Sequence, residues 1–158
     1  MARHQERRYP IGSISEGTMR PEDLIPEFLS ELRYRMRERR IKGHAALYRE
    51  IDKRSDAEGY YETEEADWDL EAQFDALGEY AGPYFYFGAN EGDGADYGYW
   101  LSWDSLNEAV RCKDLLKVGD LADVPSDYRG EVLLVNDHGN ATLYIKTSRA
   151  MREVWAIV

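Results

Sequence analysis

The stretch Tyr84-Phe-Tyr-Phe-Gly-Ala-Asn-Glu-Gly-Asp-Gly-Ala-Asp-Tyr-Gly-Tyr-Trp-Leu-Ser-Trp103 contains two aromatic runs separated by a segment rich in glycine and acidic residues. Aromatic runs of this length are typical of strands, because aromatic side chains pack well on a pleated sheet. Glycine and aspartate between two strands are typical of a turn. We therefore expect an antiparallel hairpin with a long tip, Gly88–Asp96. The first strand, 84–87, is expected to be covered on both faces, and some aromatic side chains of the second strand are expected to reach the surface.

An amphipathic helix is expected before this hairpin. Thr63 is a good N-cap, and the acidic residues that follow it favour the positive end of a helix dipole. Leu70, Phe74 and Leu77 recur at helical spacing and predict one apolar face. The opposite face is then almost wholly carboxylate, and Gly78 ends the helix.

Two further helices are expected near the start of the chain. The first spans Thr18–Arg40, where apolar residues recur at helical spacing, and Pro26 predicts either a new helix start or a kink inside it. Gly43 separates it from a second helix, Ala45–Lys53. Residues 1–17, rich in charge, glycine and serine, are expected to be a loose lead-in.

The last third of the chain predicts one helix followed by strands. The helix is expected over Asp104–Cys112, and the strands over Glu131–Val135, Ala141–Ile145 and Glu153–Val158. Helices first and strands later predict the α+β class. The expected fold has N-terminal helices followed by a mostly antiparallel β-sheet of about four to six strands with packed helices.

Length and composition predict a single domain over residues 1–158. Its parts are the loose segment 1–17, a basic helical part 18–54 and an acidic α+β body 55–158. The lone Cys112 excludes an intrachain disulfide and predicts a buried thiol in a reducing compartment. No apolar run reaches the length of a signal peptide core or a membrane span. We therefore expect a cytoplasmic protein with no membrane partner.

Charge is distributed unevenly along the chain. Residues 55–110 contain no lysine or arginine but hold 15 acidic residues and 13 of the 20 aromatic ones, whereas residues 1–54 hold 13 basic and 9 acidic residues. Carboxylates without local counter-charge repel one another, so this window predicts a surface selected for its negative field. The acidic body argues against direct nucleic-acid binding. The arginine run 33–40 is either a solvated helix face or a complement to the acidic half, in the same chain or in a homodimer.

We expect the acidic window to bind a basic, nucleic-acid-binding protein or complex. Carboxylates and tyrosines offer charge-assisted hydrogen bonds and cation–π contacts to arginine and lysine. The expected partner-binding residues are Glu62, Glu64, Glu65, Asp67, Asp69, Glu71, Asp75, Glu91, Asp93, Asp96, Tyr97 and Tyr99.

Two other kinds of site are alternatives to this binding role. Asn90, Glu91, Asp93 and Asp96 supply the oxygen ligands that Ca²⁺ prefers, but without the EF-hand pattern, and a solvated hairpin tip is the alternative. His138 follows an aspartate, as a general base does, yet its surroundings are also typical of a hairpin turn. P-loop, dinucleotide, nucleophile-elbow and zinc motifs are missing from the sequence. We therefore expect no enzyme, cofactor or metal, with a small hydrolase or metal-binding domain as a third possibility.

Three stretches, Pro21–Pro26, Tyr84–Gly98 and Val135–Tyr144, resemble small proteins of phages and mobile elements. In size and acidity the chain is similar to anti-CRISPR and anti-restriction inhibitors, some of which imitate the charge of DNA. This resemblance implies an inhibitor that occupies the basic surface of a CRISPR or restriction complex in the cytoplasm of a bacterial host. The hairpin around Asp93 with the strand at Gly130 and the terminal hairpin also resembles SUKH immunity proteins, which implies neutralisation of a toxin nuclease.

Overall fold

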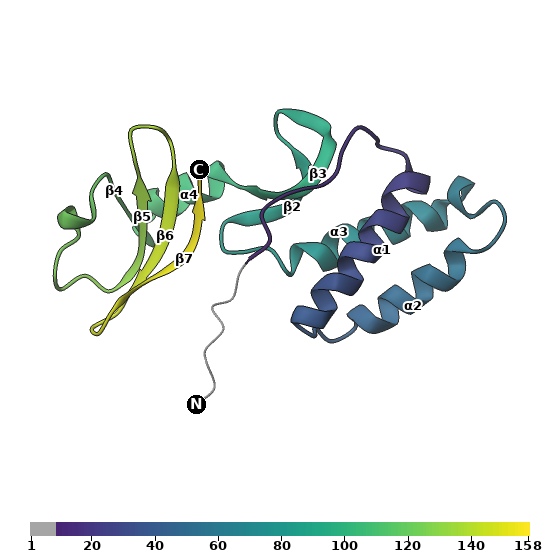
Figure 1. Cartoon of the computed structure of the whole chain (residues 1–158), viewed down its shortest axis with the longest axis horizontal. Coiled ribbons are helices and arrows are strands. Elements are labelled where there is room, and N and C mark those ends of the chain that lie inside the picture. The colour runs from purple at the N-terminus through teal and green to yellow at the C-terminus, as the bar shows by residue number, and fades with distance from the viewer. Residues whose placement is uncertain (1–8) are drawn as a thin grey trace. The chain divides into compact units, whose positions relative to one another are not determined.

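The computed structural model describes residues 9–158, which form two compact units (Figure 1). Residues 10–101 form one, called the helical unit, and residues 102–158 with Tyr9 belong to the other, called the strand unit. The described residues contain four α-helices and two mostly antiparallel sheets, which confirms the α+β class. The strands form two sheets rather than one, because each unit pairs only its own strands. A single domain over 1–158 stays a prediction.

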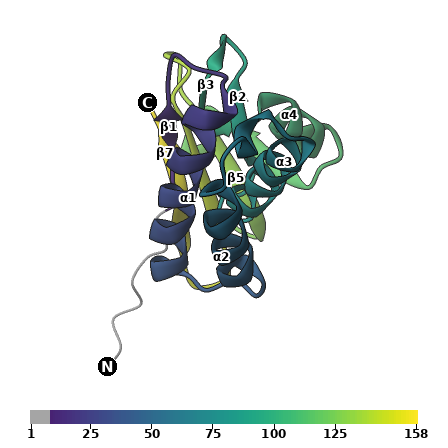
Figure 2. The ribbon, with the colours of Figure 1, turned by 90° about the vertical axis from the view of Figure 1, so that its right-hand side faces the viewer.

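The helical unit contains α1 (Pro21–Glu38), α2 (His44–Ser55) and α3 (Glu64–Gly78), which lie side by side in Figures 1 and 2. All three expected helices are confirmed. The expected new start at Pro26 is wrong, because α1 runs continuously through this residue. Pro26 lies in the second turn, where its ring removes only the hydrogen bond to the carbonyl of Glu22.

The sheet of the helical unit has the order β1-β3-β2, from β1 (Gly12–Ser15), β2 (Phe85–Asn90) and β3 (Asp93–Leu101). Both pairings are antiparallel. The expected loose lead-in is wrong for β1, which pairs with β3 at the position of Gly98. A Cβ added to Gly98 would lie 2.1 Å from the carbonyl oxygen of Gly12, so only glycine permits this close approach of two backbones.

The tip of the aromatic hairpin is shorter than expected. β2 continues to Asn90 and β3 begins at Asp93, so the expected long tip over 88–96 is wrong. Asn90 makes the tight turn possible, because its Oδ1 accepts the backbone N–H of Gly92 at 2.8 Å. Residues 94–96 then form an irregularity in β3.

An aromatic cluster lies between the sheet and the helices. The ring of Phe28 on α1 meets Phe74, Phe87 and Tyr97 edge-on, at centroid distances of 5.2, 5.1 and 6.0 Å. α1 and α3 therefore cover one face of the sheet. A second cluster lies between the three helices and contains Ile25, Leu29, Ile51, Tyr60 and Ala66.

The strand unit consists of one helix and a four-stranded sheet. Its elements are α4 (Trp103–Arg111), β4 (Leu115–Val118), β5 (Gly130–Val135), β6 (Ala141–Lys146) and β7 (Met151–Ile157), with sheet order β4-β5-β6-β7. The helix and the last three strands are confirmed. β4, which pairs parallel to β5, was not expected from the sequence, because it is too short to show a period. The buried side chains of the strand unit are mostly aliphatic: Leu106, Leu115, Val118, Val132, Leu133, Ala141, Leu143 and Trp155.

Cys112 caps the end of α4 and is exposed, so the expected buried thiol is wrong. Its Sγ lies 3.4 Å from a carboxylate oxygen of Glu108, one turn earlier. This hydrogen bond raises the pKa of the thiol. Within residues 9–158, no helix combines the length and apolar character needed to cross a membrane.

Candidate partner-binding face

The start of α3 places a row of carboxylates in solvent. Thr63 caps the helix as expected, because its Oγ1 accepts the backbone N–H of Ala66 at 3.3 Å. The acids of the first turn lie at the positive end of the helix dipole, which stabilises them there. Ala66, Gln73 and Leu77 point into the unit, so the opposite side of α3 is exposed.

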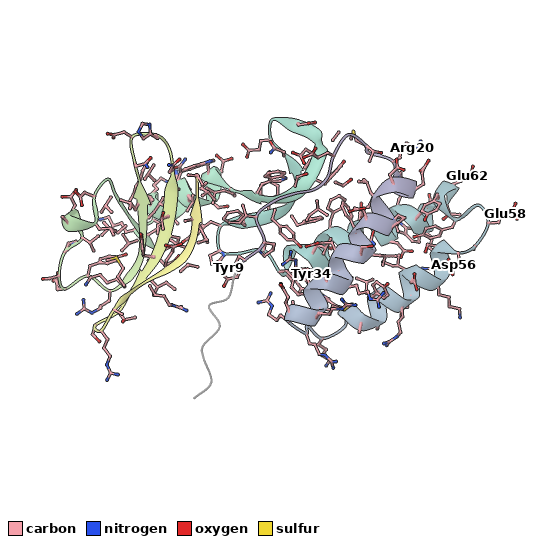
Figure 3. All side chains as sticks on the ribbon, viewed as in Figure 1. Tyr9, Arg20, Tyr34, Asp56, Glu58 and Glu62 are labelled. Carbon is pink, nitrogen blue, oxygen red and sulfur yellow. The ribbon has the colours of Figure 1, made fainter. Side chains whose placement is uncertain are left out.

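We call the exposed carboxylates of α3 and of the turn before it the acidic face. Its members are Glu62, Glu64, Glu65, Asp67, Glu71 and Asp75. Among the described residues, only Glu65 has a cation within ion-pair distance, Arg54 at 3.8 Å. Asp56 and Glu58 continue the charge toward α2, and Figure 3 shows both pointing outward with Glu62. The acidic face is therefore largely uncompensated.

Trp68 lies within the acidic face and is 65% exposed. It belongs to one stripe of α3, in which Glu64, Trp68, Glu71 and Asp75 follow at i, i+4, i+7 and i+11. Trp68 is not among the residues that were expected to bind a partner. The available signal was its position opposite the apolar face of α3, since a tryptophan there cannot join the core.

Asp69 was expected to bind a partner and instead stabilises the helical unit. Its carboxylate is buried and accepts hydrogen bonds from Nε and Nη2 of Arg54 at 3.0 and 2.7 Å, and from the hydroxyl of Tyr60 at 2.8 Å. The hydrogen bond to Asp69 raises the pKa of Arg54, and burial beside the carboxylate raises the pKa of Tyr60. The expected binding role of Asp69 is wrong, because helical periodicity turns it toward α2.

Tyr97 and Tyr99 are also buried, so the expectation that they lie on the binding surface is wrong. Both point from β3 toward the helices. The hydroxyl of Tyr99 donates to Glu31 at 3.2 Å, and Glu31 accepts from Arg35 at 2.6 Å. Burial raises the pKa of Tyr99 further above its ordinary value. Alternation along the strand puts both tyrosines on the covered face of the sheet.

The remaining expected acids belong to the hairpin of β2 and β3 rather than to α3. Glu91 and Asp93 are exposed, and Asp93 accepts the backbone N–H of Ala95 at 3.0 Å. Asp96 accepts a hydrogen bond from the hydroxyl of Ser13 on β1 at 2.5 Å. Within residues 9–158, no group of three or more histidine, cysteine, aspartate or glutamate side chains is arranged to hold a metal ion. The carboxylate of Asp93 therefore stabilises the turn, and that of Asp96 bonds β1 to β3.

The two described histidines differ in their surroundings. His138 lies in an exposed turn, where Oδ1 of Asn136 accepts its backbone N–H at 2.9 Å. His44 is buried, with Nδ1 2.9 Å from the hydroxyl of Tyr80 and Nε2 bonded to the Glu79 carboxylate. No sequence pattern links His44 to Glu79, 35 residues away. Both ring nitrogens are occupied, so His44 joins the start of α2 to the end of α3.

Comparison with models of protein families, with curated proteins and with solved structures finds no match. The resemblances to inhibitors of bacterial defence and to immunity proteins therefore stay predictions.

Proposed function

We propose that this protein is a non-enzymatic binding protein, whose acidic face occupies a basic surface on a partner protein. The observation that carries the proposal is Trp68, a large apolar side chain exposed among carboxylates of which only Glu65 has a cation within ion-pair distance among residues 9–158. Tryptophan is enriched among the residues that dominate the binding energy of protein interfaces.

The chemistry of the acidic face fits arginine and lysine. The indole of Trp68 offers a flat surface to a guanidinium or ammonium group, and a cation–π contact contributes about 0.5–2 kcal/mol. Glu64 and Glu71, one turn to either side of it, accept charge-assisted hydrogen bonds from the same groups. The unpaired carboxylates also raise the rate of association with a cationic partner at low salt.

The finer form of this proposal makes the partner a nucleic-acid-binding complex of bacterial defence, of the CRISPR or restriction kind. Surfaces that bind nucleic acid are lined with arginine and lysine, which neutralise phosphates. A helix that presents carboxylates in their place competes for those cations, as a DNA mimic does. The resemblance to small acidic inhibitors of phages supports this choice of partner.

The test compares two variants with the same change in net charge. The first, E64Q/E65Q/D67N/E71Q, neutralises four carboxylates of the acidic face but leaves Asp69 intact. The second, D114N/D123N/D127N/D137N, neutralises four exposed carboxylates of the strand unit. Tagged wild type and both variants are used to capture proteins from a bacterial host lysate at low and high salt. The captured complex is then assayed for DNA binding in a gel shift.

Wild type and the strand-unit variant are expected to capture the same basic complex and to reduce its DNA binding. The acidic-face variant is expected to lose capture, and W68A to weaken it about tenfold or more. High salt should weaken capture, since exposed charges are screened. Equal capture by both charge variants would contradict the proposal.

A further inference from the structure

The helical unit carries a second charged surface, which the proposed function does not use. We call it the basic face, and its members are Arg33, Arg37, Arg40 and Lys42. All four are exposed, and among residues 9–158 none of them forms an ion pair. Tyr34, 52% exposed, lies beside Arg33 on α1.

The other arginines of this segment are engaged within the unit. Arg35 bonds Glu31 and Glu38 at 2.6 and 2.8 Å. Arg39 donates to the backbone carbonyl of Glu79 and stacks over the ring of Tyr80 at 5.4 Å. The cations of the basic face are therefore the exposed ones: Arg33 and Arg37 lie on the solvent side of α1, and Arg40 and Lys42 lie in the connection between α1 and α2.

The basic and acidic faces match in spacing as well as in sign. Arg33 and Arg37 are four residues apart on α1, as Glu71 and Asp75 are on α3. Four residues of helix rise about 6 Å, so two guanidinium groups of one helix can meet two carboxylates of the other. Each pair has an exposed aromatic residue beside it, Tyr34 or Trp68.

We propose that the basic face of one copy of this chain docks on the acidic face of a second copy. Every molecule carries both the basic face and the acidic face. The helical unit, to which both belong, holds 21 acidic and 10 basic residues. A nucleic acid would meet net repulsion from this unit, whereas a second copy offers a local carboxylate row with a tryptophan. Self-association and binding of a cationic partner then exclude each other at the acidic face.

The test uses sedimentation velocity of the full chain over a range of concentrations at low and high salt. Variant R33E/R37E/R40E makes both faces acidic, and variant E64R/E71R/D75R makes both faces basic. Each is expected to be monomeric alone. Mixed in equal amounts they are expected to associate again, because the first retains the native acidic face and the second the native basic face.

Two controls keep the outcome interpretable. Variant K117E/R149E/R152E changes net charge equally through exposed cations of the strand unit, and should associate like wild type. Variant R33Q/R37Q/R40Q replaces the glutamate variant if that one fails to fold by circular dichroism, and should associate at least about tenfold more weakly than wild type.

Several results would overturn this inference. These are a wild type that stays monomeric at low salt, a mixture that does not associate, and a strand-unit control that loses association with the others. Gel shifts that show DNA bound by wild type but not by R33E/R37E/R40E would assign the basic face to nucleic acid instead. The acidic-face proposal is tested separately, because the basic-face variants leave α3 unchanged.

Discussion

The helical unit and the strand unit bury different kinds of side chain in their interiors. The helical unit encloses an aromatic cluster and several buried polar contacts, whereas the strand unit encloses mostly aliphatic side chains. Residues 10–101 hold 21 acidic and 10 basic residues, and residues 102–158 hold 9 and 7. The unit with the more elaborate interior is thus also the one with the strong negative charge.

This difference shows how the negative surface arises. Arg35, Arg39 and Arg54 are all engaged within the helical unit, with Glu31, with the end of α3 and with Asp69. Each of these contacts joins separate parts of the unit or lies against its core. An arginine that bonds inside the unit is less available to neutralise carboxylates on its surface. Of the carboxylates on the acidic face, only Glu65 has one of these three arginines within ion-pair distance, Arg54 at 3.8 Å.

The largest effect is expected when the centre of the aromatic cluster in the helical unit is removed. Phe28→Ala deletes a fully buried ring that contacts three other rings, and should lower the free energy of unfolding by about 3–5 kcal/mol. Urea unfolding followed by circular dichroism measures this. Tyr34→Ala on the same helix is exposed and should change stability by less than about 0.5 kcal/mol. A loss at Phe28 no larger than at Tyr34 would show that the aromatic cluster contributes little to the stability of the helical unit.

The close approach of β1 to β3 gives the next largest effect. Gly98→Ala places a methyl group against the Gly12 carbonyl, and should cost about 2–3 kcal/mol as β1 is displaced. Gly94→Ala lies on the same strand with no atom within 4 Å of the added Cβ, and should be nearly neutral. Thermal unfolding of the two variants measures the difference. Equal melting temperatures would show that β1 contributes little to the helical unit.

A third pair of variants separates structural from surface acids on one helix. Asp69→Asn weakens the hydrogen bonds to Arg54 and Tyr60, and should cost about 1–2 kcal/mol, since Arg54 is partly solvated and screened. Asp67→Asn, exposed on α3, should leave stability unchanged within about 0.5 kcal/mol. Chemical unfolding distinguishes the two. A destabilised Asp67→Asn would mean that the acidic face also stabilises the fold.

The smallest effect concerns the strand unit, where the carboxylate of Glu108 contacts the thiol of Cys112. Glu108→Gln removes the carboxylate that raises the pKa of Cys112, so the thiolate fraction at a given pH increases. Alkylation by iodoacetamide at pH 8 should therefore be about two- to threefold faster. Glu153→Gln, in the same unit, should not change the rate. A slower reaction in Glu108→Gln would contradict the sign of this shift.

Local patterns were sufficient for most of the fold. The cap at Thr63 and the helical spacing after it located α3, and the aromatic runs located β2 and β3. β1 and β4 were missed because each has four residues, and their pairing depends on partners elsewhere in the chain. Gly98 carried the signal for β1, but only the structure shows which backbone approaches it.

The candidate site was predicted in part, for a similar reason. Composition located the carboxylates of α3, five of which are exposed. It could not separate Asp69 from them: helical periodicity turns Asp69 inward, and its partner Arg54 lies 15 residues earlier in the sequence. Likewise, Tyr97 and Tyr99 differ from exposed tyrosines only through the helices that cover them.

The pairing of β1 with β3 also bears on how the chain folds as it is synthesised. Ser13 and Asp96, which are hydrogen-bonded across these strands, are 83 residues apart in sequence. All three helices of the unit are translated before β1 meets its partner. Until then β1 has an unpaired backbone, and the face of the helices that β3 covers is exposed. Such non-local closure slows folding, and the sheet of the helical unit can form only after its three helices have been translated.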